Sequence, residues 1–427
     1  MSGFKVVRKY LFPTLLIVVL AVSVAAYTSY SIRTLPKANP SDVHVGVAFG
    51  GETVQEAKIL IDRVKNYTNL FILDAGRNPI TENQTCVEEI CDYAVANGLS
   101  VIVNVGVELP LDTSRYWFWE QPLNVTEQWK AMWGDKFLGM YYNDEPGGIQ
   151  LDGNWSAWFR IYGQYYLQLR NSSKAASDLY QTYLKMRGFM ENGTSPSNYN
   201  LEANFFVQDV LEGDRGLNAL KAAGVTTYTS DYGLYWFDYL GGYNVMFTEL
   251  GWNCSVAEQI ALVKGAARLQ DKEWGAIITW KYDSAPYLDG GDQIYNQMLT
   301  SYESGAKYIV IFNYPYANGS NYGVMTNDQF IALQRFWNDI HHNGFPDLSG
   351  PEAALVLPEN YGWGMRDPND TIWGFWPPDG KTLQVAMATS TLLSRYGTTL
   401  DVVYDDPQYP VANVGYQHVY YWNQTNI

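Results

Sequence analysis

The segment GMYYNDEPGG, residues 139–148, places the adjacent carboxylates Asp144 and Glu145 where a run of small and aromatic residues ends. Pro146 and two glycines follow, a composition typical of a turn or a helix start. Cleavage of a glycosidic bond requires two carboxyl groups, one that donates a proton and one that acts as nucleophile or base. Further acidic residues lie at the ends of other apolar runs of the chain: Asp231, Glu249 and Asp283.

A proton donor of this kind must hold its proton near the working pH. Burial or a neighbouring negative charge raises the pKa of a carboxyl group, and Asp144 could supply that charge if its side chain converges on Glu145. We therefore regard Glu145, Glu249 and Asp144 as the candidate catalytic residues. The competing interpretation of residues 139–148 is an acidic turn without a chemical role.

Other reaction types have no local signature. No G-x-S-x-G elbow, G-x-x-x-x-G-K-[ST] loop or G-x-G-x-x-G fingerprint occurs, so acyl, phosphoryl and hydride transfer lack support. The four histidines form no H-E-x-x-H array, and the Asp-rich segments 288–292 and 366–370 have the composition of ordinary turns. We expect no cofactor and no metal site. A net charge of -16 opposes binding to phosphate backbones, so we expect no nucleic-acid partner.

The elements that would position these carboxylates follow a repeated pattern. Apolar runs of strand length alternate with segments in which apolar residues recur at helical spacing, such as Val54, Ala57, Ile61 and Val64. Eight nearly uniform strands with intervening helices favour a parallel sheet closed into a (β/α)8 TIM barrel over residues 43–345, with catalytic groups at the carboxyl ends of the strands. The expected strands are 44–51, 69–76, 100–108, 137–145, 225–231, 243–251, 274–283 and 307–315.

One strand assignment has an alternative. Residues 201–208, LEANFFVQ, are a ninth strand candidate, which we assign to an excursion after the fourth strand. If they formed a barrel strand, the number of every later strand would rise by one. The excursion, at about residues 147–200, is aromatic: its Trp155, Trp158 and Tyr162 either wall a cleft or only cover the barrel.

Both ends of the chain carry further signals. Residues 1–27 combine basic residues with an apolar run, the pattern of a cleaved signal peptide or a retained membrane anchor, and residues 28–42 read as a linker. Export to the extracellular space or the cell surface is also favoured by ten Asn-X-Ser/Thr sites, which predict a glycoprotein. Residues 352–427 hold three strand-like segments and a helix. They predict a small α/β domain that leans on the barrel or lacks part of a longer version.

The segment FLGMYYNDEP resembles the end of the fourth strand in sugar-cleaving (β/α)8 glycoside hydrolases, where an Asn-Glu pair, often followed by Pro, supplies the acid/base Glu. The resemblance implies this role for Glu145. The sequence departs from the pattern because Asp144 stands directly before Glu145 and the Asn lies one place earlier, at Asn143. The family's nucleophile is a Glu that ends strand seven, whereas the seventh expected strand ends in Asp283. Glu249 would fit only if the strand numbering shifted by one.

An adjacent Asp-Glu pair also resembles hexosaminidases that use the acetamido group of the substrate as nucleophile, with Asp orienting that group and Glu as acid. In that arrangement Asp144 and Glu145 would act as a unit and Glu249 would be dispensable. The terminal domain distantly resembles the flavodoxin-like or amidotransferase-like modules of some β-galactosidases, although it lacks a Cys for such chemistry.

Side chains at the strand ends are suited to stack on and hydrogen-bond a sugar. The sequence therefore predicts an exported, glycoside hydrolase-like protein that acts on an oligo- or polysaccharide and meets the membrane through its N-terminal segment. The alternative is a surface protein that binds glycans or belongs to the cell envelope without catalysis. The expected substrate-binding residues are Asn143, Asp231, Trp280, Tyr282, Asp283, Asn313 and Tyr314.

Overall fold

The signal or anchor predicted at 1–27 lies outside the described residues, as does the linker except for Asp42. Trp155, Trp158 and Tyr162 of the aromatic excursion lie outside them too. No helix within the described part of the chain is long and apolar enough to cross a membrane. The computed structural model describes residues 42–424 except for 75–78, 107–115, 154–162, 193, 195–198, 253, 315–322 and 344–349.

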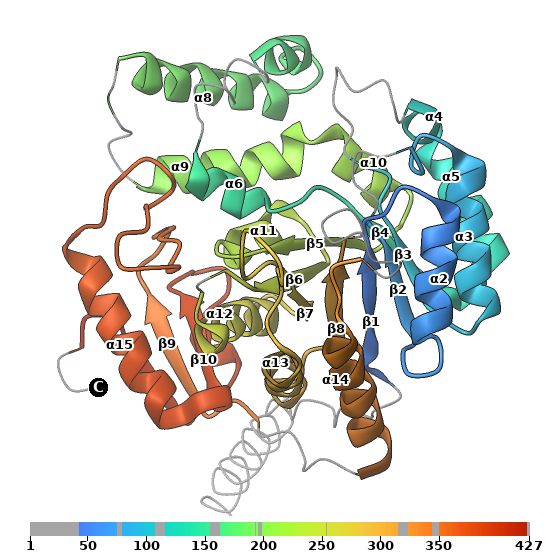
Figure 1. The fold of residues 1–427 in the computed structure, drawn as a ribbon. Coiled ribbons are helices and arrows are strands. Elements are labelled where there is room, and N and C mark those ends of the chain that lie inside the picture. Colours follow the sequence, from blue (N-terminus) through green and yellow to red (C-terminus); the bar gives the residue numbers. More distant parts are fainter. Residues whose placement is uncertain are drawn as a thin grey trace, which may run out of the picture.

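Eight parallel strands close into a barrel in chain order, which confirms the predicted (β/α)8 TIM barrel (Figure 1). The last strand pairs in parallel with the first, from His44↔Tyr308 to Phe49↔Asn313, and closes the sheet. All carboxyl ends of the strands therefore lie at one end of the barrel. The strands are β1 (His44–Phe49), β2 (Leu70–Leu73), β3 (Ser100–Val103), β4 (Phe137–Tyr141), β5 (Thr227–Asp231), β6 (Val245–Leu250), β7 (Glu273–Ile278) and β8 (Tyr308–Asn313).

Most barrel helices bury one apolar face, as the helical spacing predicted. The first helix starts with a capping box, in which the Glu56 amide donates to the Thr53 hydroxyl and the Glu56 carboxylate accepts from the Thr53 amide. Its residues Ala57, Ile61 and Val64 are buried in the core between helices and sheet. The main barrel helices are α2 (Val54–Val64), α3 (Gln84–Ala96), α5 (Pro122–Trp133), α10 (Arg215–Ala222), α11 (Tyr235–Gly241), α12 (Val256–Leu269), α13 (Gly291–Glu303) and α14 (Asn327–Asn338). Of these, α11 and α12 are buried nearly all round.

The barrel interior changes from apolar to polar toward the carboxyl end. Tyr228 of β5 and Phe247 of β6 belong to an apolar cluster that fills the interior. Because side chains alternate along a strand, Ser230 and Glu249, two residues further on, also point inward. The interior is thus packed below and carries hydrogen-bonding groups at its mouth.

Several strands end earlier than predicted. β4 ends at Tyr141, so Glu145 lies beyond the strand, and β7 ends at Ile278, well before Asp283. Single backbone hydrogen bonds to the neighbouring strands continue past these ends, from the Tyr142 amide to the Tyr228 carbonyl (2.9 Å) and from the Thr279 amide to the Leu250 carbonyl (3.2 Å). Asp231, by contrast, is the last residue of β5.

The described residues between β4 and β5 are mainly helical. Residues 201–208 do not form the ninth strand candidate but belong to α9, in which Ala203 and Phe206 are buried at helical spacing. A short apolar run of this kind fits either structure until its packing is known. Their assignment to the excursion is confirmed, so the strand numbering does not shift. Figure 1 shows α6 (Pro146–Asp152), α8 (Lys174–Glu191) and α9 (Tyr199–Gln208) together over one end of the barrel.

The last part of the chain, which we call the C-terminal unit (residues 352–424), packs beside the barrel. Its three parallel strands are ordered β10-β9-β11. A Cβ at Gly265 of α12 would lie 2.3 Å from the Val402 carbonyl oxygen, so that helix sits directly on the sheet. The likeness to flavodoxin-like or amidotransferase-like modules stays a prediction. The elements are β9 (Ala353–Leu357), α15 (Gly380–Tyr396), β10 (Leu400–Tyr404) and β11 (His418–Tyr421).

Candidate active site

Glu145 lies in a tight turn between β4 and α6. Its φ of 51° and ψ of 50° are left-handed, which is rare for a residue with a side chain and needs enforcement by its surroundings. Its amide donates to the Ser230 carbonyl (3.0 Å), and its own carbonyl accepts from the Ile149 amide (2.7 Å). The side chain makes no capping hydrogen bond to α6, so the helix start does not consume the carboxyl group.

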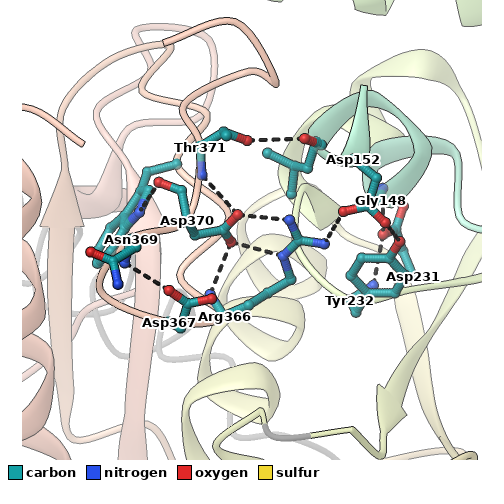
Figure 2. Close-up of polar contacts among 11 residues, drawn as sticks. Gly148, Asp152, Asp231, Tyr232, Arg366, Asp367, Asn369, Asp370 and Thr371 are labelled. Carbon is teal, nitrogen blue, oxygen red and sulfur yellow. Dashed lines mark hydrogen bonds and ion pairs between the residues drawn. The ribbon is translucent and has the colours of Figure 1, made fainter. Parts of the chain in front are cut away.

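Asp231 anchors this turn from β5. Its buried carboxylate accepts hydrogen bonds from the amides of Gly147 (2.6 Å) and Gly148 (2.9 Å), the first turn of α6. Figure 2 shows Asp231 between Gly148 and Tyr232. The Asp231 carboxylate also accepts a hydrogen bond from the Tyr232 amide (2.6 Å). The structure therefore places this predicted substrate-binding residue beneath the Glu145 turn as its support.

Packing explains the two glycines behind Pro146. A Cβ at Gly147 would lie 2.7 Å from the Leu234 Cβ, and one at Gly148 would lie 2.3 Å from the ring of Tyr232. Real Cβ atoms do not tolerate such distances. The glycines thus let the start of α6 approach β5 and its loop closely enough for Asp231 to reach both amides.

Glu249 lies inside the mouth of the barrel, 5% exposed. The Ser230 hydroxyl donates to Glu249 Oε1 (2.6 Å) and lies 3.1 Å from Asp144 Oδ1. The Ser230 amide donates to the Tyr141 oxygen (3.2 Å), and the Tyr141 hydroxyl in turn donates to Asp144. This network fixes Glu249 and Asp144 through two buried hydroxyl groups.

The carboxyl groups of Glu145 and Glu249 are in hydrogen-bond contact. Burial, then the negative charges of Asp144 and Asp231, raise the pKa of Glu145 to about 8, and the contact with Glu249 opposes part of this shift. Burial, then the charge of Glu145, raises the pKa of Glu249 well above its usual range. Two carboxylates this close cannot both ionise at neutral pH, so the pair retains a proton.

Asp144 and Asn143 build the turn beside the pair. Asp144 is exposed as a residue, but its carboxylate contacts the buried hydroxyls of Tyr141 and Ser230. The Asn143 side chain accepts from the Asp144 amide (3.0 Å), and its carbonyl accepts from the Thr229 hydroxyl (2.8 Å). The adjacent Asp-Glu pair therefore splits: Asp144 turns toward the Tyr141–Ser230 network and Glu145 toward Glu249.

Aromatic side chains gather on the rim after β6, β7 and β8. The Trp280 ring lies 5.7 Å from Phe312 and 6.2 Å from Tyr314 between ring centroids. Tyr282 is 46% exposed and Trp252, which was not predicted, 38%. Trp252 donates its amide to the Trp280 carbonyl, which joins the loops after β6 and β7. These rings offer apolar faces to a ligand at the mouth.

Asp283 and Asn313, two further predicted site residues, have other surroundings. Asp283 is exposed in the loop between β7 and α13. Asn313 is 1% exposed, and its amide oxygen accepts from the Met325 amide (3.2 Å), so it holds the loop that leads to α14. The structure thus brings Glu145, Glu249 and Asp144 together, with Asp231 behind them, whereas Asp283 is exposed in a loop and Asn313 holds another loop.

Sequence reasoning missed Ser230 and Tyr141. The alternation of side chains along a strand could have indicated Ser230, because Ser230 lies two residues after the inward-facing Tyr228 on β5. Asp74 and Asn104 were also missed, although they follow β2 and β3 directly. Asn104 Nδ2 donates to Asp74 Oδ1 (2.7 Å), and the charge of Asp74 contributes to the raised pKa of Tyr141.

Within the described ranges, no cluster of His, Cys, Asp and Glu side chains is arranged to hold a metal ion.

The fold resembles that of solved carbohydrate-related proteins, although the sequence matches none by family. No protein-family model and no curated protein matches the chain. A polyextremophilic β-galactosidase from the Antarctic haloarchaeon Halorubrum lacusprofundi has a similar structure, with a TM-score of 0.55 and 11% sequence identity over 89% of this chain and 69% of that chain. The chain shares the (β/α)8 TIM-barrel fold of that β-galactosidase. A GH5_18 protein from Bifidobacterium longum in complex with Manb1-4GlcNAc is also similar, with a TM-score of 0.48 and 8% identity over 90% of this chain and 96% of that chain.

In this barrel, the acidic partner of Glu145 comes from the sixth strand. The family resemblance implied a Glu at the end of strand seven, but β7 ends at Ile278 and is followed by Thr279 and Trp280. Because the numbering does not shift, Glu249 does not occupy the family's strand-seven position. Its contact with Glu145 arises because β6 carries it inside the barrel mouth.

Proposed function

We propose that the protein hydrolyses glycosidic bonds of an extracellular glycan, with Glu145 as acid/base and Glu249 as its carboxylate partner. The observation that carries the proposal is the contact between these two buried carboxyl groups at the mouth of the barrel. The fold hosts many chemistries, so the argument rests on the site. The rim aromatics suit sugar rings, which present apolar faces and hydroxyl edges.

The geometry supports a distinct role for each group in the proposed reaction. Glu145 is the more exposed carboxyl of the pair, so it would protonate the leaving oxygen as the glycosidic bond breaks. Glu249, held by the Ser230 hydroxyl, would attack the anomeric carbon from inside the barrel. Glu145, then deprotonated, would activate the water that releases the sugar.

The close approach of the two carboxyl groups favours a retaining reaction. Inverting enzymes keep their carboxyl groups about 6.5–9.5 Å apart to admit a water molecule, whereas retaining enzymes hold them about 5–5.5 Å apart. A hydrogen bond between Glu145 and Glu249 is shorter than either range, so the two groups must move apart to admit a sugar, and the retaining separation requires the smaller movement. The product should therefore keep the anomeric configuration of the substrate.

The first experiment is a glycan panel assayed in parallel for binding and for release of reducing sugar. We expect both binding and release on at least one polymer. Binding without release, at enzyme concentrations that saturate the glycan, would favour the non-catalytic glycan-binding alternative. No release and no binding on a panel that spans the common glycan classes would contradict both functions.

The pH dependence of kcat/KM should follow the proton of Glu145. Activity requires that the pair hold one proton, on Glu145, while Glu249 is ionised. With its pKa raised to about 8, Glu145 loses that proton above about pH 8 and kcat/KM falls. Because burial and the charge of Glu145 also raise the pKa of Glu249, kcat/KM should fall again at lower pH, where Glu249 takes up a proton. An unshifted Glu would lose its proton at about pH 4.3. Asp144→Asn removes a negative charge that raises this pKa and should move the basic limb to lower pH. A wild-type profile that already collapses above pH 5 would contradict the assignment.

A further inference from the structure

One charged side chain of the C-terminal unit reaches the helix that Glu145 begins. Arg366 lies in the loop after β9, and its Nη1 donates to Asp152 Oδ1 (2.6 Å), the last residue of α6. Its Nε and Nη2 bind the two oxygens of Asp370 at 2.8 and 2.7 Å (Figure 2). This fork on Asp370 fixes the guanidinium plane, so the remaining nitrogen is aimed at Asp152.

The contact continues toward the carboxyl pair through Tyr232. The Tyr232 hydroxyl donates to Asp152 Oδ2 (2.7 Å), and the Arg366 guanidinium lies 5.1 Å from the ring centroid. The ring packs against Gly148 so closely that no Cβ would fit there. After burial, the charge of Glu145 is the strongest influence that raises the pKa of Tyr232, so this ring borders the site.

The same loop of the C-terminal unit holds α6 at further points. The Thr371 hydroxyl donates to the Leu151 carbonyl (3.0 Å), and Gln150 Nε2 donates to the Trp373 carbonyl (3.2 Å). The Leu151 side chain packs against Gly364. The end of α6 is therefore bound to the C-terminal unit, while Asp231 of the barrel binds its start.

A helix this short depends on such contacts. α6 spans seven residues, and isolated helices of that length are not stable in water. The helix begins at Glu145, whose backbone is left-handed. The Glu145 carboxyl group makes no capping hydrogen bond, so it does not stabilise the helix start. If the end of α6 is released, the contacts at its start alone must hold the strained turn.

We infer that Arg366 is a positioning residue for Glu145: it clamps the end of α6 through Asp152 and Tyr232, and so makes the C-terminal unit part of the active-site support. The catalytic consequence rests on the proposed function, whereas the clamp itself does not. The charged and titratable groups that face Glu145 are Asp144, Asp152, Asp231, Glu249 and Tyr232.

The test compares Arg366→Gln with Arg268→Gln in the full chain. Arg268 pairs with buried Asp401 (2.6 Å) and joins α12 to β10, so its loss breaks another ion pair of the same interface without touching α6. We expect Arg366→Gln to lower kcat about tenfold with KM within about twofold, because the acid is misplaced rather than the substrate. Arg366→Lys, which keeps the charge but not the fork, should restore part of kcat.

The pH profile separates positioning from general loss of structure. Without Arg366 the charge of Asp152 is unpaired, which raises the pKa of Glu145, so the basic limb of kcat/KM should move up by about half a pH unit. Arg268→Gln should leave the limb in place. A tenfold loss in both variants with unmoved limbs would overturn the inference, because it would show only a general structural role.

Hydrogen exchange of the peptide that covers residues 142–153 tests the clamp independently of catalysis. Its amides should exchange faster in Arg366→Gln than in the wild type. In Arg268→Gln their exchange rates should equal those of the wild type. If Arg366→Gln does not fold, Asp152→Ala removes the same contact from the other partner and is measured in the same exchange experiment. Unchanged exchange overturns the clamp. Faster exchange in a protein that hydrolyses no glycan upholds the clamp and rejects the proposed function.

Discussion

Glu145→Gln should lower kcat on a natural glycan by about 10³-fold or more, within the range that general acid catalysis supplies. Gln has nearly the shape of Glu but cannot donate a proton to the leaving oxygen. The fold should survive, because the side chain does not cap α6 and the turn is held by the Asp231 carboxylate and the Ser230 carbonyl. The measurement is the release of reducing sugar under saturating substrate.

A leaving group that needs no protonation sharpens this test. With an activated aryl glycoside, Glu145→Gln should lose much less of its bond-cleavage rate, because the phenolate departs unaided. Asp283→Asn is the matched control, since Asp283 is an exposed acid on the same rim and contacts neither carboxyl group of the pair. Full activity of Glu145→Gln on the natural polymer would remove Glu145 from the mechanism.

Glu249→Ala should lose on the order of 10⁴-fold or more in kcat, because no nucleophile remains to form the covalent intermediate. Ser230 keeps a second acceptor in Asp144, at 3.1 Å, so its hydroxyl is not left unpaired in the core. Azide or formate can enter the space that the side chain vacates and should restore activity, with an azide product of inverted configuration. Nuclear magnetic resonance of the wild-type product should show retention.

The same variant discriminates the substrate-assisted arrangement. If Asp144 and Glu145 act as a unit on an acetamido sugar, Glu249→Ala stays active and Asp144→Asn loses activity. We expect the opposite order, because the Asp144 carboxylate is bound by the Tyr141 and Ser230 hydroxyls while Glu145 contacts Glu249. Substrates with and without the acetamido group should therefore behave alike.

The barrel could be predicted from the sequence because its signals are local. Apolar runs of strand length and helical spacing, as in the helix that buries Ala57 and Ile61, are written within a few residues. Strand ends were less accurate, since pairing at the rim depends on neighbouring strands. Residues 201–208 carried an apolar run that fits a strand or a helix, and only its packing against α11 and the neighbouring helices made it α9.

The sequence by itself determined that acidic side chains follow the strands of a closed parallel sheet, because alternation and chain order place every strand end on one rim. Only the tertiary structure decided which acids meet. Glu145 contacts Glu249, and the Tyr141 and Ser230 hydroxyls bind Asp144. Asp231 supports the turn, and Asp283 is exposed in a loop. These outcomes depend on contacts between distant segments, such as β5 with α6 and Arg366 with Asp152. The "DEPGG" run is thus an acidic turn and a candidate catalytic edge at once, because its glycines and its neighbours force Glu145 into one strained position.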